Sequence, residues 1–145
     1  MNNKDYLKLD NQLCFAVYTC SKEIIRLYRP FLDKLGITYT HYITLLVLWE
    51  TDPIPFKKLC NHLYLDSGTM TPVLKSMEKK GLLTRSRMEN DERQISISLT
   101  QLGRELKEQA ATIPLQMLCR TQLSPEEANT LRDTLHRLLK QLPQA

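Results

Sequence analysis

The sequence predicts a mainly α-helical (α+β) fold, a winged helix-turn-helix of six helices with a β-hairpin wing. Two short helical segments, Phe56–Leu63 and Asp66–Lys80, are joined by a tight turn, as a helix-turn-helix requires. Directly behind them the apolar period changes from helical to alternating, which predicts strands at Leu83–Arg87 and Gln94–Leu99. The charged residues 88–92 form the turn between these strands. A length of 145 residues fits one domain, 1–145.

The chain begins with a long predicted helix. Apolar residues recur at helical spacing over Asn11–Leu35, and Gly36 is suited to end the helix. Pro30 lies inside this segment and lacks the backbone N–H that its turn needs. We therefore expect a kink or a break near Tyr28.

Capping residues and prolines set the boundaries in the middle of the chain. Thr38 is predicted to cap a second helix, Tyr39–Glu50, which is apolar on nearly every face and should form the buried centre. Two prolines make Thr51–Pro55 a loop with a short extended piece. Asp66 is a good N-cap for the second helix of the helix-turn-helix, and Pro72 should make its first turns irregular.

Two further helices are predicted after the wing. Thr100 caps a helix of about twenty residues that Pro114 should bend. Ser124–Glu127 is a capping box with proline at the first helical position, and its helix runs to about Leu142. A partner subunit is expected to cover the apolar stripe of this last helix, which consists of Leu131, Leu135, Leu138, Leu139 and Leu142.

Composition narrows the class of protein. The chain is 42% hydrophobic and 25% charged and has neither a long apolar run nor a signal peptide, so we expect a cytoplasmic protein without a membrane segment. Its four cysteines are far apart and form no CxxC pair, and its three histidines are not at ligand spacing. We therefore expect reduced thiols and neither a metal site nor a cofactor.

The distribution of charge favours nucleic-acid binding. The net charge is +4, and eight Lys or Arg against five Asp or Glu lie between Phe56 and Gln94. Short hydroxyl side chains at the start of the second helix suit base edges and phosphates, and the lysines that follow suit the DNA backbone. Arginines on the wing suit a narrow minor groove. The candidate DNA contacts are Ser67, Thr69, Thr71, Lys75, Lys79, Lys80, Arg85, Arg87 and Arg93.

Two motifs in this region resemble the MarR family of transcriptional regulators. Asp91–Arg93 followed by Leu99–Gly103 is similar to the wing signature of that family, and Leu74–Arg85 is similar to the exit of its recognition helix. The resemblance implies that Asp91 orients Arg93 by a salt bridge and that Arg93 enters the minor groove. It also implies a homodimer on a pseudo-palindromic operator of double-stranded DNA, with dimerisation helices at about 10–35 and 101–142 and a DNA-binding lobe at about 53–99.

The N-terminal part resembles one branch of this family, the organic hydroperoxide (OhrR) repressors. The similar segments are Leu9–Phe15, Leu32–Leu35 and Ile37–Tyr39, together with Tyr28. The resemblance implies that Cys14 is a peroxide-reactive thiol and that Tyr28 and Tyr39 hydrogen-bond it from the other subunit. An organic hydroperoxide would then be the inducer, and Cys119 matches a second cysteine that captures the oxidised thiol of the partner.

Position supports a reactive Cys14 independently. If Asp10 caps the first helix, Cys14 lies in its first turn, where the helix dipole favours thiolate, the form that peroxide oxidises. Cys20 and Cys60, in contrast, are expected to be small buried hydrophobic residues, and a buried structural thiol is the alternative for Cys119.

Two other functions are weighed against this hypothesis. One is a MarR-type repressor that responds to a small aromatic ligand. The other is a thiol peroxidase that uses Cys14 catalytically, but the sequence has no Cys-His motif and no thioredoxin-like βαβ pattern, so no enzymatic activity is expected.

Overall fold

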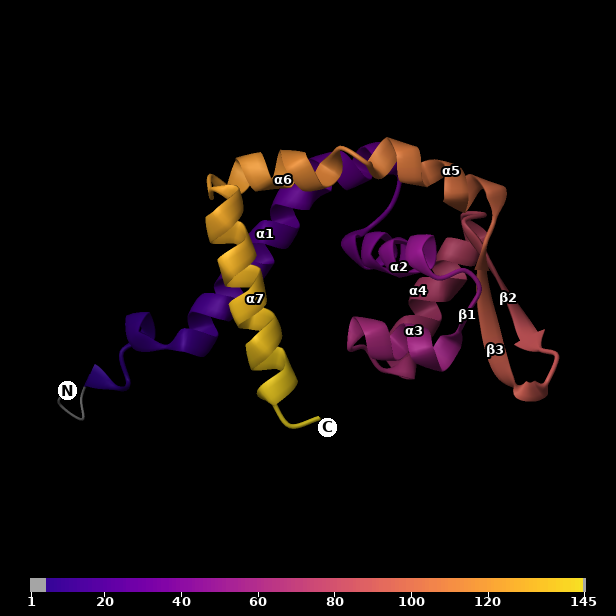
Figure 1. The fold of residues 1–145 in the computed structure, drawn as a ribbon, viewed down its shortest axis with the longest axis horizontal. Helices are drawn as coiled ribbons and strands as arrows, with labels where there is room; N and C mark the ends of the chain where they lie inside the picture. Colours follow the sequence, from indigo (N-terminus) through magenta and orange to yellow (C-terminus); the bar gives the residue numbers. More distant parts are fainter. Residues whose placement is uncertain (1–4, 145) are drawn as a thin grey trace. The chain divides into compact units, whose positions relative to one another are not determined.

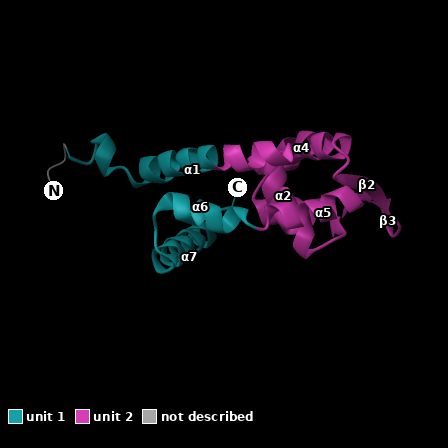
Figure 2. Ribbon diagram, turned by 90° about the horizontal axis from the view of Figure 1, so that it is seen from above, with its two compact units in different colours: residues 1–27, 112–145 teal, residues 28–111 magenta. Residues whose placement is uncertain are grey.

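The computed structural model describes residues 5–144, apart from the side chain of Glu92; residues 1–4 and 145, the ends of the predicted domain 1–145, lie outside the described part. The structure has two compact units, residues 28–111 and residues 1–27 with 112–145 (Figures 1 and 2). Each unit is described separately below.

The first long helix, α1 (Leu13–Leu35), differs from the prediction at its start and in its middle. Leu9–Asn11 form a separate 3₁₀ helix, so Asp10 does not cap α1. We expected a kink or a break near Tyr28; α1 continues through Pro30, so there is no break. Because Pro30 has no N–H, the carbonyl of Arg26 lacks its usual helical donor. Both residues are exposed, so water can donate to this carbonyl instead.

The end of α1 is confirmed. Gly36 has a φ of +70°, and the Ile37 N–H donates to the Leu32 carbonyl at 3.1 Å. This is the Schellman arrangement, in which a left-handed residue closes the helix and two flanking apolar side chains are buried. Leu32 and Ile37 are 2% and 5% exposed, so the turn is anchored in the core of residues 28–111.

Helix α2 (Tyr39–Glu50) forms the centre of this unit, as predicted. Its buried residues are His41, Tyr42, Thr44, Leu45 and Leu48. Thr38 caps the helix in a capping box whose second member is His41, since His41 Nδ1 accepts from the Thr38 N–H at 3.2 Å. Burial, with a smaller contribution from Lys80, lowers the pKa of His41, so the imidazole is held neutral and can accept this hydrogen bond.

The helix-turn-helix consists of α3 (Phe56–Leu63) and α4 (Ser67–Lys79). Asp66 caps α4 by accepting the Thr69 N–H at 2.7 Å, which confirms the predicted cap. The expected irregularity at Pro72 is absent, and α4 is continuous through this exposed proline. The carbonyl that would have paired with its missing N–H belongs to Gly68, which is also exposed.

The wing is part of a three-stranded antiparallel sheet of order β1-β3-β2, formed by β1 (Ile54–Pro55), β2 (Leu83–Met88) and β3 (Asp91–Leu99). The wing strands are longer than predicted, because pairing extends to Met88 opposite Asp91 after a bulge at Arg87. Charged residues near the turn interrupt the alternation of apolar and polar residues. The predicted strands therefore stop short of the last hydrogen-bonded pair.

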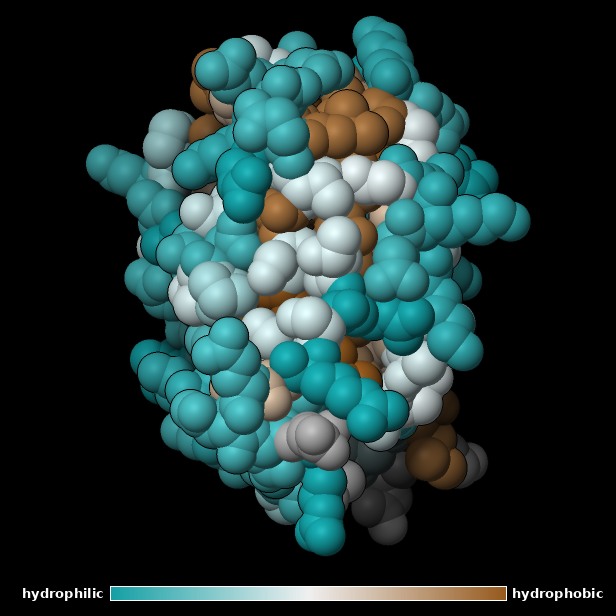
Figure 3. Space-filling model, turned by 90° about the vertical axis from the view of Figure 1, so that its right-hand side faces the viewer, coloured by the Kyte–Doolittle hydropathy of each residue, from teal (hydrophilic) through white to brown (hydrophobic). Residues whose placement is uncertain are grey.

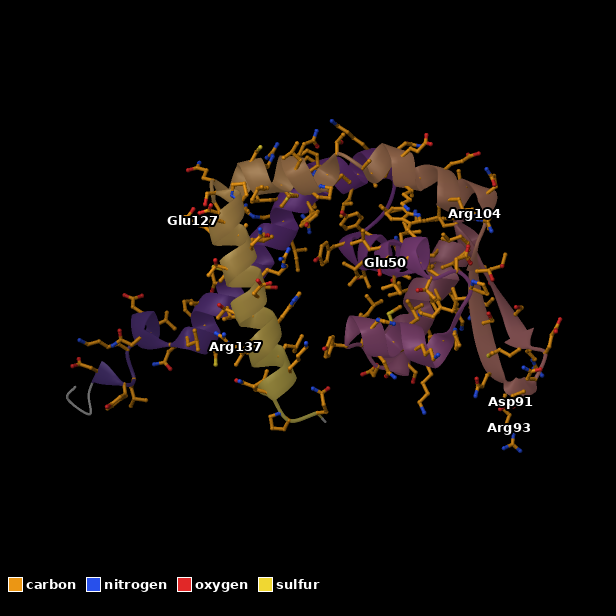
Figure 4. The ribbon with its side chains drawn as sticks, viewed as in Figure 1. Glu50, Asp91, Arg93, Arg104, Glu127 and Arg137 are labelled. Atoms are coloured by element: carbon orange, nitrogen blue, oxygen red, sulfur yellow. The ribbon has the colours of Figure 1, made fainter. Side chains whose placement is uncertain are left out.

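A junction joins the wing to helix α5 (Gln101–Ala110). A Cβ added to Gly103 would lie 2.2 Å from the carbonyl oxygen of Leu82, so only glycine permits this approach. The Gly103 carbonyl accepts from Trp49 Nε1 at 3.0 Å, and its N–H donates to the Thr100 hydroxyl at 3.1 Å. Asp52 accepts the Leu99 N–H at 3.1 Å and pairs with Arg104 at 3.6 Å. Figure 4 labels Arg104.

The second unit contains the first part of α1 with α6 (Ile113–Thr121) and α7 (Pro125–Gln141). The predicted helix of about twenty residues after Thr100 is divided into α5 and α6, and is not merely bent. Pro114 occupies a first-turn position of α6, where its missing N–H costs nothing, so a new helix starts there. The capping box of α7 is confirmed, with Glu127 and Ser124 bonded reciprocally.

The apolar residues of this second unit are largely uncovered. Helix α7 contains no buried residue, and Leu131, Leu135, Leu138 and Leu142 are 36–49% exposed. In the part of α1 that belongs to the unit, Leu13, Phe15 and Tyr18 are exposed as well. No helix in residues 5–144 is long and apolar enough to cross a membrane.

The junction makes a stability prediction. Gly103→Ala should lower the free energy of unfolding by about 1–3 kcal/mol, because the added methyl group forces the backbone of Leu82 to move. Chemical denaturation measures the change. Gly68→Ala is the matched control, since its Cβ would meet Asp66 Oδ1 at an ordinary 3.4 Å. Equal stability of the two variants would contradict the proposed close approach.

Candidate DNA interface and thiol sites

The start of α4 presents hydroxyl groups to solvent. Ser67 and Thr69 are exposed, and Thr71 is partly exposed. The Thr71 hydroxyl donates to the Ser67 carbonyl at 2.7 Å, so its remaining hydrogen-bonding capacity is as an acceptor. The buried side of α4, formed by Met70, Leu74 and Met77, fixes which face these hydroxyls occupy.

Cationic side chains continue along the same helix. Lys75, Lys79 and Lys80 are all exposed, as expected for groups that contact a phosphate backbone.

Arg85, a predicted DNA contact, has a partner within the chain. Its guanidinium binds both carboxylate oxygens of Glu78 at 3.2 Å, and its backbone N–H donates to the same side chain at 3.2 Å. Hydrogen bonding to Arg85 lowers the pKa of the Glu78 carboxyl. Arg85 therefore links β2 to α4.

The wing carries two other arginines, Arg87 and Arg93, both exposed. In Figure 4 the Arg93 side chain extends from the end of the hairpin, close to Asp91. Asp91 Oδ1 accepts the backbone N–H of Arg93 at 3.0 Å and makes no ion pair with its guanidinium. The expected salt bridge is thus replaced by a turn-closing hydrogen bond, which leaves the guanidinium available. Figure 3 faces the wing and shows a mostly hydrophilic surface with small apolar areas.

All four cysteines are free thiols. Cys14 is the second residue of α1 and is exposed, and Cys119 on α6 is exposed too. Cys60 is buried as predicted, and burial raises the pKa of its thiol. The prediction for Cys20 is wrong, because it is exposed in a stretch of α1 where no residue is buried.

The structure brings Tyr28 and Tyr39 together, with ring centroids 5.0 Å apart. Sequence reasoning missed Tyr42, whose ring lies 5.7 Å from Tyr28 and 6.3 Å from Tyr39; the three-residue spacing of Tyr39 and Tyr42 on one helix was the available signal. Burial, with the neighbouring Tyr39 and Tyr42, raises the pKa of Tyr28 to about 12. Tyr28 is therefore a neutral phenol and a hydrogen-bond donor at neutral pH.

The phenol hydroxyls of this cluster make no hydrogen bond within the described residues, and no unbonded polar side-chain atom there is fully buried. These hydroxyls therefore retain access to a group from outside the unit. Cys14 belongs to the other compact unit, residues 1–27 and 112–145.

A helix-turn-helix with hydroxyls and lysines on its second helix, followed by a cationic hairpin, defines the class of winged-helix DNA-binding regulators. Residues 26–110 match the family model "Transcriptional regulator SarA/Rot". The chain is 50% identical over 145 residues to the organic hydroperoxide resistance transcriptional regulator of Bacillus subtilis, with 99% of each chain covered. It is 42% identical to the regulator SarZ of Staphylococcus saprophyticus, over 93% of this chain and 92% of SarZ.

Solved structures agree with these relatives. Reduced AbfR bound to DNA is 34% identical with a TM-score of 0.79, and 97% of each chain is covered. AbfR, from Staphylococcus epidermidis, has also been solved overoxidised on DNA and in a disulfide form. The chain belongs to the MarR and SarA type of winged-helix transcriptional regulators, and within it to the organic hydroperoxide resistance branch. This confirms the predicted fold, and the relatives are regulators rather than enzymes.

The free guanidinium at the wing makes a prediction about DNA. Arg93→Ala should weaken binding to duplex DNA from the promoter beside the protein's own gene and reduce the slope of log affinity against log salt by about one. Fluorescence anisotropy at several salt concentrations measures both quantities. Lys107→Ala, which removes an exposed charge from α5, is the control. Unchanged affinity and slope in Arg93→Ala would remove the wing from the interface.

Proposed function

We propose that this protein is a homodimeric repressor that binds a pseudo-palindromic operator and releases it when an organic hydroperoxide oxidises Cys14. The observation that carries the proposal is the 50% identity, over 99% of both chains, to a regulator of organic hydroperoxide resistance. Because its partner is chromosomal DNA, we assign the protein to the cytoplasm.

The DNA-binding part of the proposal uses residues 28–111. The start of α4, with Ser67, Thr69 and Thr71, enters a major groove, and Lys75 contacts the adjacent backbone. Arg87 and Arg93 enter the neighbouring minor groove. Two copies related by twofold symmetry read half-sites about one helical turn, roughly 34 Å, apart. The exposure of these side chains in a single unit supports this arrangement.

The homodimer is supported by the uncovered apolar surface of the second unit. A 17-residue helix with no buried residue gains little from folding alone, since most helix stability in proteins comes from packing an apolar face. A second copy would cover α7 and the first part of α1 at once. We therefore assign dimerisation to the helices within about 10–35 and 101–142.

The sensing step is an oxidation of the Cys14 thiolate. Its sulfur attacks the terminal oxygen of ROOH, an S–O bond forms as the O–O bond breaks, and the product is a sulfenic acid. The alkoxide that leaves takes a proton from water and becomes the alcohol ROH. The Cys14 side chain is not buried within its own chain. In the reduced dimer, we assign Tyr28 and Tyr39 of the partner subunit as hydrogen-bond donors to the Cys14 sulfur. Their raised pKa values keep both phenols protonated. Oxidation breaks these bonds and shifts the dimer interface.

Cys119 is the proposed resolving residue. Its thiol attacks the sulfenic sulfur of Cys14 in the other subunit, which forms a disulfide and releases water. The exposure of the Cys119 thiol supports this role against that of a buried structural cysteine. A disulfide form of AbfR, a 34% identical relative, has been solved, which supports a disulfide as the oxidised state.

Cys14→Ser tests the sensor. The variant should bind promoter DNA nearly as well as the parent, because a hydroxyl can still bond to the phenols, with a loss of at most about 1 kcal/mol. Cumene hydroperoxide should release the parent but not the variant in a gel-shift assay, with Cys20→Ser as the matched control. Normal release of Cys14→Ser would exclude Cys14 as the sensor, and a parent that peroxide never releases would favour a small-ligand inducer.

Cys119→Ser tests the resolving step. Peroxide should convert the parent into a covalent dimer of about twice 16.9 kDa on a non-reducing gel, and dithiothreitol should reverse it. Cys119→Ser should abolish this band while Cys14 still forms a sulfenic acid that dimedone labels. A persistent dimer band in Cys119→Ser would identify Cys20 or Cys60 as the resolving thiol, and an oxidised parent without the band would be a one-cysteine sensor.

A further inference from the structure

Tyr42 is the buried member of the tyrosine cluster. It is 3% exposed, whereas Tyr28 and Tyr39 are only partly buried. Its ring is tilted by 44° to that of Tyr28 and by 48° to that of Tyr39, with centroids 5.7 and 6.3 Å away. Tilted aromatic rings attract each other at such separations. Tyr42 therefore packs against both of the phenols to which the sensing contact is assigned.

The backbone at Tyr42 is held by the turn between α1 and α2. The Tyr42 N–H donates to the Thr38 carbonyl at 3.0 Å, which is the first hydrogen bond of α2. Ile37 precedes the cap and Tyr42 is the fourth helical residue; these are the two positions of a hydrophobic staple, and both residues are buried. Gly36 closes α1 directly before them. Tyr42 therefore has a fixed place beside the other two rings.

The sensing contact needs the hydroxyls of Tyr28 and Tyr39 at defined positions. A hydrogen bond weakens steeply when donor and acceptor are out of line, so a small rotation of either ring reduces it. Neither hydroxyl hydrogen-bonds to another group within the described residues. The packing of the rings is therefore the restraint that orients the two phenols.

We infer that Tyr42 is a positioning residue for the sensor, whose ring holds Tyr28 and Tyr39 so that both hydroxyls can donate to the Cys14 thiolate across the dimer. The inference rests on the proposed function and adds a residue that does not itself bond to the sulfur. Hydrogen bonds to a thiolate favour this reactive form over the thiol. Loss of the Tyr42 ring therefore slows oxidation of Cys14, whereas loss of its hydroxyl alone does not.

Two variants of the full chain separate the ring from the hydroxyl. Tyr42→Leu should slow the formation of sulfenic acid at Cys14 by cumene hydroperoxide about tenfold, the effect of losing one hydrogen bond to a charged group. It should also move the pH profile of Cys14 alkylation by iodoacetamide to higher pH. Tyr42→Phe should match the parent in both respects. Mass spectrometry of the Cys14 peptide, with dimedone to trap the sulfenic acid, measures both reactions.

Leu48→Ala controls for a general loosening of the core, since Leu48 is a buried residue of the same helix. This variant should leave the pH profile unchanged. Parent-like binding of the reduced variants to promoter DNA establishes that they fold. Should Tyr42→Leu bind no DNA, Tyr42→Met, which fills the site with a flexible apolar chain, takes its place with the same expected result.

A background without the two donor hydroxyls separates positioning from a purely structural role. In the Tyr28→Phe, Tyr39→Phe double variant the rings remain and the donors are gone, so Tyr42→Leu should slow oxidation no further. Further slowing there, a Tyr42→Phe variant as slow as Tyr42→Leu, or a parent-like Tyr42→Leu would each overturn the positioning role and leave the proposed function intact. A parent whose Cys14 forms no sulfenic acid would overturn both.

Discussion

The close approach of Gly103 to the Leu82 carbonyl is the constraint on which the rest of residues 28–111 depends. The same carbonyl accepts the Thr100 N–H at 3.1 Å, so one oxygen fixes both the end of β3 and the start of α5. Trp49 then ties this point to α2, the buried centre. The direction in which the wing projects is thus set by a hydrogen-bonded corner at its base, and the exposed arginines at its far end need no packing of their own.

The two units differ in how completely the chain stabilises them. Residues 28–111 contain nearly all the buried apolar side chains, whereas the other unit exposes leucines and aromatics along whole helices. The tyrosine cluster shows the same difference on a smaller scale, since its rings are packed and its hydroxyls lack partners. A second copy could cover the exposed apolar side chains and supply a partner for the phenol hydroxyls, so we propose that the sensing chemistry takes place in the dimer.

Local patterns predicted the fold where capping or periodicity carried the information. Thr38, Asp66 and Ser124 marked helix starts correctly, because an N-cap is a contact between near neighbours. Prolines were less predictable: α1 tolerates Pro30, whereas Pro114 starts a new helix. The partner of Arg85 depends on a contact between α4 and β2, and the approach of Tyr42 to Tyr28 depends on one between α1 and α2. The spacing of residues along one element does not encode such contacts. The 3₁₀ helix at Leu9–Asn11 likewise removed Asp10 from its expected capping position.

The ion pair between Glu78 and Arg85 restricts the movement of the wing relative to α4. It fastens the last turn of the recognition helix to the first half of β2 by three hydrogen bonds. Helix α4 and the wing are consequently linked, and a change in the orientation of one relative to the other breaks these hydrogen bonds. In the proposed homodimer, this link favours release by a change in the spacing between the two DNA-binding lobes over a movement of the wing against α4.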